Sequence, residues 1–365
     1  MNTLNIKIYT PAHSYPILLG ENLLEKLTEL YDFRDYTKIL LISDSNVGPI
    51  YAANVRTAIS KNYEIPITEF ESPAGEKSKL LKTITKIWEK LSEIGADRKS
   101  LVINLGGGIT TDMGGFAASC YMRGINFINI ATSLEAMVDA SIGGKTGINL
   151  GSLKNHLGTF AHPKCVIMDI QTLTTLSKRD LIAAFAEIIK HGLIADAKYF
   201  DLVKMQNPLN LDTELLNKII LGSLKIKANV VEKDEKEAGV RQILNFGHTA
   251  GHAIETLSFK TKKPLLHGEA VALGMIIAAK LSELVGNIDH ETFQVIENVI
   301  NFAGLPTKLQ NYQTKEIIKL LSSDKKSIAG KAKWVLLKSI GEADWNVEVG
   351  DDLVRQAIAS VVSNQ

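Results

Sequence analysis

The sequence predicts an α/β domain over residues 1–177, followed by an all-α domain over residues 178–365. Three observations lead to this prediction. A chain of 365 residues is longer than a single hydrophobic core usually organises, so two domains are expected. The first half alternates short apolar runs with helical patterns, whereas long helical patterns dominate after Ser177. Such alternation is typical of a mostly parallel sheet with helices on both faces.

Strands of the first domain are expected where short apolar runs end at glycine or polar residues. The first ten residues alternate apolar and polar side chains and lack the apolar core of a signal peptide, so they indicate a strand. The other expected strands are 38–44, 65–70, 100–105, 124–130 and 165–169, and the expected helices are 78–95 and 110–120. The helices expected in the second domain are 179–194, 213–233, 240–259, 268–284 and 290–303.

The composition is that of an ordinary globular protein, with 45% hydrophobic and 22% charged residues. A formal net charge of +1 gives no broad field for nucleic acid or an anionic membrane, so any basic site must be local. No apolar run approaches the ~18 residues of a membrane span. The two cysteines, Cys120 and Cys165, are far apart, which predicts neither a disulfide framework nor a paired-cysteine metal site. A reducing cytoplasm is therefore expected.

A cluster of three glycines, Gly106 to Gly108, lies between an expected strand and the expected helix 110–120. Glycines at such a place let the backbone approach a pyrophosphate, and the helix N-terminus supplies free N–H groups. This predicts a Rossmann-like, dinucleotide-binding first domain. The spacing is not G-x-G-x-x-G, so a tight turn that needs small residues is the alternative. Asp112, expected in the first turn, would cap the helix or bind a ribose hydroxyl.

A second glycine-rich segment, from Gly143 to Gly147, contains Lys145. It fails the P-loop spacing because position 139 is aspartate rather than glycine, which disfavours hydrolysis of nucleoside triphosphates. A lysine among glycines can still hold a phosphate through its charge and the neighbouring backbone donors.

The expected helix 240–259 carries polar side chains at helical spacing. Arg241, Asn245, His248 and His252 are separated by four, three and four residues and would share one face. A third histidine, His267, opens the next helix, and Glu187 and Lys190 lie one turn apart in an apolar run. Two imidazoles and a carboxylate suit a catalytic zinc ion with open positions. The spacing leaves open whether His248, His252 or both are ligands.

Taken together, five motifs resemble those of the 3-dehydroquinate synthase family. They are GGGITTDMGGFAAS, MVDASIGGKTGIN, FAEIIK, GVRQILNFGHTAGHAIE and HGEAVALGM, in this order along the chain. The resemblance extends from Asp44 to the segment 324–326.

The resemblance implies a role for each matching residue. Glu187, His248 and His267 would bind Zn²⁺ or Co²⁺, and His252 would handle protons without binding the metal. The substrate site would contain Asp139, Lys145, Lys190, Lys227, Arg241, Asn245 and Lys326, with Lys154 and Asn155 near the phosphate and Arg123 reaching the phosphate of the neighbouring subunit of a homodimer. The NAD site would contain Asp44, Asn46, Glu76, Lys79, Gly107, Gly108, Asp112, Thr132, Ser133, Lys145, Lys154 and Thr175.

The implied reaction converts 3-deoxy-arabino-heptulosonate 7-phosphate to 3-dehydroquinate and phosphate. The secondary alcohol at C5 is oxidised transiently with NAD⁺, phosphate leaves by elimination, the ketone is reduced again, and an intramolecular aldol reaction closes the carbocycle. The implied substrate is thus a small sugar phosphate, and neither nucleic acid nor a membrane is an expected partner.

Six positions depart from the family pattern: Ala131, Ser133, Glu135, Leu153, Ser177 and Ala184. Ser133 keeps the hydroxyl of the usual threonine, whereas Glu135 places a charge where an apolar residue is usual. These changes affect the expected backbone path and nicotinamide pocket, and none removes an implied ligand.

Three alternatives remain open at the level of the sequence. A cyclase acting on another sugar phosphate, such as a 2-deoxy-scyllo-inosose or 2-epi-5-epi-valiolone synthase, would share fold, NAD and metal; Arg241, Leu244, Asn245 and His252 favour the dehydroquinate type. A polyol dehydrogenase would release NADH, but the segment 143–147 is not expected in such an enzyme. The departures around Glu135 motivate the third alternative, a catalytically inactive binding protein.

Overall fold

The computed structural model describes residues 4–9, 14–151, 153–310, 312–323 and 332–362. The chain forms two compact units. Unit 1 comprises Met1–Leu176 and Lys227–Lys236, and unit 2 comprises Ser177–Ile226 and Glu237–Gln365. The two domains expected at 1–177 and 178–365 stay a prediction, because compactness alone does not show that a segment folds independently.

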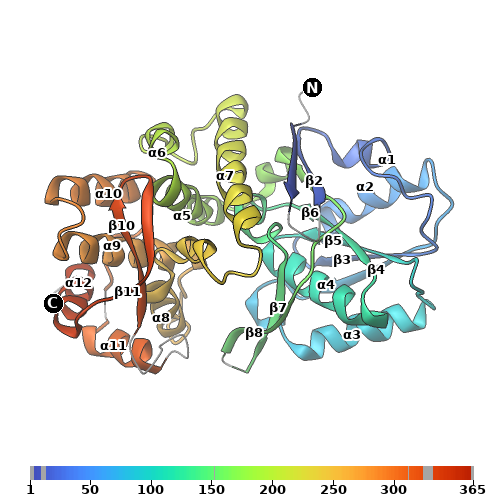
Figure 1. Cartoon of the computed structure of the whole chain (residues 1–365). Coiled ribbons are helices and arrows are strands. Elements are labelled where there is room, and N and C mark those ends of the chain that lie inside the picture. The colour runs from blue at the N-terminus through green and yellow to red at the C-terminus, as the bar shows by residue number, and fades with distance from the viewer. Residues whose placement is uncertain (1–3, 10–13, 152, 311, 324–331, 363–365) are drawn as a thin grey trace. The chain divides into compact units, whose positions relative to one another are not determined.

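A seven-stranded sheet forms the centre of unit 1 (Figure 1). Its order is β1-β2-β9-β6-β5-β3-β4, and only β1 runs antiparallel to its neighbour. The strands are β1 (Leu4–Tyr9), β2 (Ser14–Gly20), β3 (Ile39–Asp44), β4 (Ile67–Ser72), β5 (Leu101–Gly106), β6 (Asn126–Ala131) and β9 (Val166–Asp169). The predicted, mostly parallel sheet is therefore confirmed.

Helices cover both faces of this sheet, as the sequence predicts. Successive side chains of a strand point to opposite faces, so Ile39 and Leu41 pack against α1 (Leu27–Leu30) and α2 (Gly48–Ser60). Leu40 and Ile42 face the other way, toward the side chains of α3 (Leu81–Glu93) and α4 (Gly108–Cys120). Continuous apolar strands follow from burial on both faces.

A hairpin that the sequence analysis did not predict begins directly after Gly144. Its strands are β7 (Lys145–Leu150) and β8 (Leu153–Phe160). A Cβ atom on Gly147 would lie 2.6 Å from the carbonyl oxygen of Leu157, and one on Gly158 would lie 2.3 Å from that of Thr146. These two glycines therefore allow the two strands to pair closely. Glycines also interrupt the alternation of apolar and polar side chains by which a short strand is recognised in a sequence.

Unit 2 is mainly helical, which confirms the predicted character of the second half. Its helices are α5 (Lys178–Ala195), α6 (Ala197–Val203), α7 (Thr213–Lys233, whose end from Lys227 belongs to unit 1), α8 (His248–Ser258), α9 (His267–Leu284), α10 (His290–Phe302), α11 (Thr314–Ser323) and α12 (Asp351–Val361). Unit 2 also contains a hairpin of β10 (Lys333–Ser339) and β11 (Glu342–Glu348) that the sequence analysis did not expect. Helix α9 is buried on nearly all sides, as its apolar composition requires.

The prediction of one continuous helix over residues 240–259 is wrong. The segment forms a short helical turn, η6 (Val240–Asn245), and then α8 from His248. Gly247 separates them with a φ of +80°, a conformation that only glycine adopts without strain. A Cβ atom there would lie 2.6 Å from Cγ of Met275 and 2.9 Å from the carbonyl oxygen of Val271. The break is thus set by the close approach of α9, which helical spacing cannot report.

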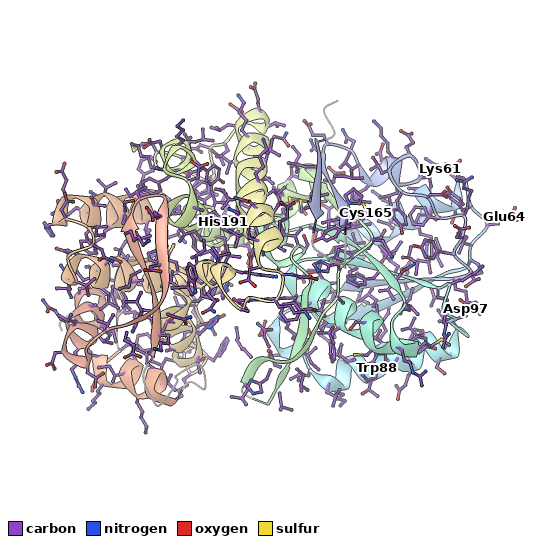
Figure 2. The ribbon with its side chains drawn as sticks, in the orientation of Figure 1. Lys61, Glu64, Trp88, Asp97, Cys165 and His191 are labelled. Carbon is purple, nitrogen blue, oxygen red and sulfur yellow. The ribbon has the colours of Figure 1, made fainter. Side chains whose placement is uncertain are left out.

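The two cysteines are free thiols in different environments. Cys165, labelled in Figure 2, directly precedes β9 and has no exposed surface, and burial raises the pKa of its thiol to about 12. Cys120 is exposed at the end of α4. In the described part of the chain, no helix has both the length and the apolar character needed to cross a membrane.

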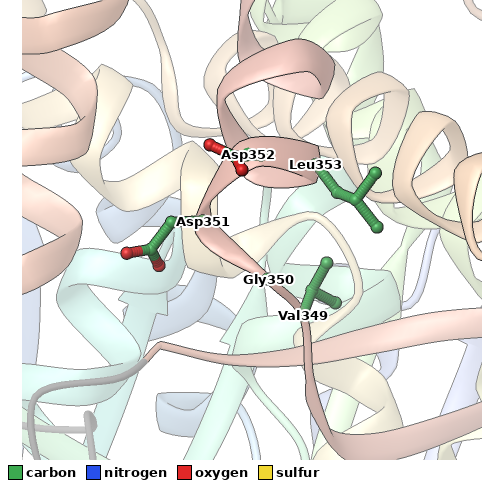
Figure 3. A pocket seen from close by; sticks show the side chains of 5 residues that line it. All are labelled: Val349, Gly350, Asp351, Asp352 and Leu353. Atoms are coloured by element: carbon green, nitrogen blue, oxygen red, sulfur yellow. The ribbon is translucent and has the colours of Figure 1, made fainter.

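A hollow of about 510 Å³ opens at the beginning of α12, lined by residues 349–353 (Figure 3). Asp351 and Asp352 occupy the first turn of the helix, where carboxylates interact favourably with the helix dipole. Among the residues that the structure describes, no histidine or basic side chain lines this hollow.

Candidate active site

The carboxyl ends of β3 and β5 lie where the strand order of the sheet reverses. From β3 the chain passes to β4 on one side, and it then returns to β5 on the other side of β3. Ligands of open α/β sheets bind outside the carboxyl ends of the strands at such a point. Asp44 ends β3, and Gly106 ends β5 directly before Gly107 and Gly108. The fold therefore brings Asp44 and the glycines to one edge of the sheet.

Helix α4 begins at Gly108, two residues earlier than expected, and Gly107 is its N-cap. Asp112 consequently lies beyond the first turn, so its expected role as a helix cap is wrong. A Cβ atom on Gly108 would lie 2.8 Å from Cβ of Ala140, and one on Gly107 would lie 3.2 Å from Oγ of Ser133. Glycine at both positions keeps the helix N-terminus open to a close ligand, so these residues fit a dinucleotide pyrophosphate.

Asp44 ties the neighbouring loops together. Its Oδ1 accepts the backbone N–H of Asn46 at 2.9 Å, and its Oδ2 accepts the hydroxyl of Thr110 at 3.2 Å. Directly after β6, the backbone N–H of Thr132 donates to the backbone oxygen of Gly106 at 3.0 Å, and Oγ of Ser133 accepts the N–H of Ala136 at 3.2 Å. These bonds fix the backbone around the glycines before any ligand arrives.

A network of polar side chains surrounds Lys79, and Lys154 joins it through Glu76, 3.8 Å away. Its members are Glu76, Lys79, Asp112, Asn149, Lys154 and Asn155. The buried Lys79 ammonium lies 2.5 Å from Oδ2 of Asp112 and donates to Oδ1 of Asn155 at 2.6 Å. Asn149, which sequence reasoning missed, donates to Glu76 at 2.7 Å and accepts the backbone N–H of Asn155 at 2.8 Å. Burial opposes the charged form of Lys79, but Asp112 and Glu76 outweigh it and raise the pKa of Lys79.

The remaining expected residues of unit 1 lie on separate elements. Lys227, near the end of α7, donates to the backbone oxygen of Asp139 at 2.6 Å and pairs with the Asp139 carboxylate. Lys145 is exposed at the start of β7. Arg123 is exposed in the turn after α4, and Thr175 is exposed at the end of η5 (Ile170–Thr175).

Three helices of unit 2 bring together a carboxylate and two imidazoles. Glu187 lies on α5, His248 begins α8, and His267 begins α9. One ligand atom of each lies within 4.8 Å of the others. Nε2 of His248 is 3.7 Å from Oε1 of Glu187, and Nε2 of His267 is 3.9 Å from the same oxygen. This arrangement can hold a divalent metal ion with open coordination positions.

The environment of Glu187 fits such an ion. Its side chain is buried, and its Oε2 forms an ion pair with Lys190. Oε1 faces His248 and His267 and accepts no hydrogen bond from the residues that the structure describes. A buried carboxylate oxygen with an unused lone pair is costly unless a cation completes its environment. The donor set of one carboxylate and two imidazoles is typical of Zn²⁺ and Co²⁺.

The nitrogen atoms of His248 face two different environments. Nε2 faces Glu187, whereas Nδ1 lies 3.3 Å from the backbone oxygen of Phe246. A proton on Nδ1 leaves the Nε2 lone pair free for a metal. Burial lowers the pKa of His248 well below its ordinary value, and Lys190, His252 and His267 act in the same direction. The residue is therefore neutral, as a metal ligand must be.

His252 stands beside this group without belonging to it. Its ring centroid is 5.2 Å from that of His248 and 5.9 Å from that of His267. The prediction that Arg241, Asn245, His248 and His252 share one helical face is wrong. The chain breaks at Gly247, so Arg241 and Asn245 belong to η6, whereas the two histidines belong to α8. Arg241 is buried, and Asn245 donates to Oε1 of Glu237 at 2.8 Å. Lys326 lies outside the described residues.

Comparison with known proteins identifies the family. Residues 69–183 match the family model described as 3-dehydroquinate synthase N-terminal, and residues 184–327 match 3-dehydroquinate synthase C-terminal. A 3-dehydroquinate synthase of Desulforamulus reducens is 43% identical over 344 residues, which cover 93% of this chain and 95% of that protein. The chain belongs to the 3-dehydroquinate synthase family.

Solved structures of related cyclases have the same fold as this member of the 3-dehydroquinate synthase family. A 2-deoxy-scyllo-inosose synthase complexed with carbaglucose-6-phosphate, NAD⁺ and Co²⁺ has a TM-score of 0.88 at 26% identity, covering 97% of this chain and 99% of that one. A 2-epi-5-epi-valiolone synthase of Streptomyces hygroscopicus with NAD⁺ and Zn²⁺ bound has a TM-score of 0.85 at 25% identity, covering 96% and 97%.

Two departures from the family pattern have a local structural explanation. Ser177 is the N-cap of α5, and its hydroxyl accepts the backbone N–H of Asp180 at 3.1 Å. Serine is a favourable N-cap, so the loss of proline is compensated. Glu135 is half-buried and contributes to the field that raises the pKa of Lys79. Nothing in the structure explains the exchange of glycine for Ala184.

Proposed function

We propose that this enzyme converts 3-deoxy-D-arabino-heptulosonate 7-phosphate to 3-dehydroquinate and phosphate, a step of the shikimate route to aromatic amino acids. The proposal rests on one observation: a chain 43% identical to a 3-dehydroquinate synthase places Glu187, His248 and His267 within reach of a single metal ion. NAD and Zn²⁺ or Co²⁺ are the proposed cofactors, because structures of similar cyclases hold them.

When bound, NAD⁺ and the metal would supply transient oxidation of the substrate alcohol and stabilisation of charge on its oxygen. Glu187, His248 and His267 would hold the metal. The proposed NAD contacts are Asp44, Asn46, Glu76, Lys79, Gly107, Gly108, Asp112, Thr132, Ser133, Lys145, Lys154 and Thr175. The proposed substrate contacts are Asp139, Lys145, Lys190, Lys227, Arg241, Asn245 and Lys326, with Arg123, Lys154 and Asn155 at the phosphate.

The cationic side chains would bind the anionic substrate and stabilise the departing phosphate. Lys190 and Lys227 are buried and are each oriented by a carboxylate, so little reorganisation is needed when substrate binds. His252 is half-buried beside the ligand histidines, and an imidazole there can hold or release a proton near neutral pH. Holding the substrate in one orientation favours loss of phosphate over side reactions.

We also propose a homodimer in the cytoplasm, with no nucleic-acid or membrane partner. The homodimer is an expectation from the family, in which Arg123 would serve the neighbouring subunit. Two free cysteines suit a reducing compartment.

The deciding experiment measures release of inorganic phosphate from 3-deoxy-D-arabino-heptulosonate 7-phosphate with NAD⁺ and Zn²⁺. We expect release with no net production of NADH, loss of activity after chelation, and recovery with Zn²⁺ or Co²⁺. The Glu187→Ala variant should lose activity by at least about 100-fold, because removal of a ligand weakens the metal site. Absence of phosphate release with every metal would overturn the proposal, and full activity of Glu187→Ala would overturn the metal assignment.

A cyclase for a different sugar phosphate is the second candidate, because the 2-deoxy-scyllo-inosose synthase shares the fold over nearly the whole chain. The same phosphate assay with glucose 6-phosphate distinguishes the two. Faster release from the hexose phosphate than from the heptulosonate phosphate would favour this candidate. Accumulation of NADH with a polyol would instead indicate a dehydrogenase.

A further inference from the structure

We propose that Glu255 positions His267 for metal binding; this inference rests on the metal site of the proposed function. Glu255 lies on α8, and its side chain is buried. Its Oε2 is 3.5 Å from Nδ1 of His267, while Nε2 of the same ring is 3.9 Å from Oε1 of Glu187. The imidazole thus lies between two carboxylates, one at each nitrogen.

The two nitrogens of a neutral imidazole have different roles. One nitrogen carries the proton and donates it to an acceptor, and the other presents a lone pair. Nδ1 of His267 lies 3.5 Å from the Glu255 carboxylate and Nε2 lies 3.9 Å from that of Glu187, so the proton is placed on Nδ1, where Glu255 accepts it. The Nε2 lone pair is then available to a metal ion that Glu187 also binds. Carboxylate–histidine–metal arrangements of this kind fix the ring and raise the basicity of the ligand nitrogen.

His248 provides an internal comparison. Its Nε2 also faces Oε1 of Glu187, and its Nδ1 lies 3.3 Å from the backbone oxygen of Phe246. Both ligand histidines therefore present Nε2 to the same carboxylate and Nδ1 to an acceptor. The acceptor is a neutral backbone carbonyl for His248 and a carboxylate for His267, so a side-chain substitution can remove the acceptor of His267 but not that of His248.

Residues other than Glu255 fix the backbone at the beginning of α9, next to His267. The Glu255 carboxylate faces the ring of His267. Oε2 of Glu269 accepts the backbone N–H of Leu266 at 2.8 Å, and Arg179 donates two hydrogen bonds of 2.7 Å to the Glu269 carboxylate. This arrangement fixes the beginning of α9. Loss of the Glu255 carboxylate should leave α9 in place and free the ring of His267.

The test measures metal affinity rather than activity. The full chain is stripped of metal, and its affinity for Zn²⁺ is determined by competition with a chromophoric chelator. We expect about 10- to 100-fold weaker binding for Glu255→Ala. Glu255→Gln should bind with intermediate affinity, because its amide oxygen can still accept the proton of Nδ1. The visible absorption bands of bound Co²⁺ should shift in both variants, since the ligand geometry changes.

Asp169→Asn is the matched control. Asp169 is equally buried, belongs to unit 1, and accepts the backbone N–H groups of Asn22 and Leu24 at 3.1 and 3.2 Å. It should leave Zn²⁺ affinity and the Co²⁺ bands unchanged. Thermal unfolding of the metal-free proteins shows which variants are folded, and Glu255→Gln decides the question if Glu255→Ala does not fold.

The outcomes separate this inference from the proposed function. If the unsubstituted protein binds no Zn²⁺ or Co²⁺, the metal part of the proposed function fails. If it binds tightly and Glu255→Gln and Glu255→Ala bind within twofold of it, the role of Glu255 is overturned while the metal site stands. Equal weakening by Asp169→Asn would also overturn the inference, because the effect would then come from loss of any buried carboxylate.

Discussion

In the described part of the chain, four lysine or arginine side chains are buried: those of Lys79, Lys190, Lys227 and Arg241. Burial of an unpaired charge is costly, and three of these cations lie against a carboxylate: Asp112, Glu187 and Asp139, respectively. Such pairs keep a positive charge in a fixed place before an anionic ligand binds. At the scale of the residue, the chain therefore contains preorganised cations rather than a generally basic surface.

Replacement of Lys79 by methionine should destabilise the protein by about 3 kcal/mol, because Asp112 would remain largely buried without its cation. The pKa of Lys79 is raised, so the contribution of its charge is fully present below the ordinary lysine pKa and is lost only as pH rises through the raised value. The loss should thus be the same at about pH 7 and pH 9. Urea unfolding at both pH values measures it.

Lys77→Met is the matched control for this prediction. Lys77 lies two residues away in the same short turn and is exposed. Its replacement should change the free energy of unfolding by less than about 0.5 kcal/mol. Equal effects of the two substitutions would mean that the pair of Lys79 and Asp112 contributes no more than a surface charge.

At the scale of the element, glycines allow α8 and α9 to meet backbone to backbone. A Cβ atom on Gly274 would lie 1.9 Å from the carbonyl oxygen of Gly247 and 2.8 Å from the backbone nitrogen of Gly251. This contact also sets the spacing of the ligands, since His248 begins α8 and His267 begins α9 with their ring centroids 5.2 Å apart.

Gly274→Ala should force the two helices apart. We expect a loss of about 2–3 kcal/mol in the free energy of unfolding, because backbone atoms cannot yield as a flexible side chain does. Zn²⁺ affinity should fall as well, since the ligand spacing changes. Gly350→Ala is the control, because a Cβ atom there would meet nothing within 4 Å and the φ of −63° suits alanine. A stable Gly274→Ala variant with unchanged Zn²⁺ affinity would contradict this account.

The limits of sequence reasoning are also clearest at this scale. Helix 213–233 is continuous and strongly periodic, and the structure has it with the predicted bounds. The spacing of Arg241 to His252 is equally helical, yet the backbone turns at Gly247 because α9 approaches closely. The periodicity of a sequence indicates which face of a helix is apolar, but it contains no information about contacts between helices.

The candidate site shows the same limit. Residue types alone indicated a metal bound by imidazoles and a carboxylate, but helical spacing left both histidines of helix 240–259 open as ligands. The structure groups His248 with Glu187 and His267, since three helices converge there. Glu255 and the carbonyl of Phe246 give no sequence signal as partners, because their role depends on which ring nitrogen faces them.

At the scale of the whole molecule, the proposed function divides its residues between two units. Unit 1 contains the glycines at the strand ends and the pair of Lys227 and Asp139, while unit 2 contains the metal-binding set. Arg123 belongs to unit 1 and is exposed in a turn where Met122, Arg123 and Gly124 have φ angles of 49°, 70° and 112°. Positive φ angles at two successive non-glycine residues, Met122 and Arg123, are strained and often mark a functional position.

If Arg123 serves the neighbouring subunit of a homodimer, two inactive variants should complement each other. Arg123→Ala and Glu187→Ala are each expected to lose activity. In a mixed dimer, the subunit with intact Glu187 receives Arg123 from its partner, so one of the two active sites works.

Random exchange of subunits makes about half of the dimers mixed, which restores about a quarter of the activity of the unsubstituted enzyme. Lys227→Ala mixed with Glu187→Ala is the control and should stay inactive, because both residues serve their own subunit. Phosphate release after subunit exchange measures the activity of both mixtures. If the mixture of Arg123→Ala with Glu187→Ala is inactive, Arg123 belongs to the site of its own subunit.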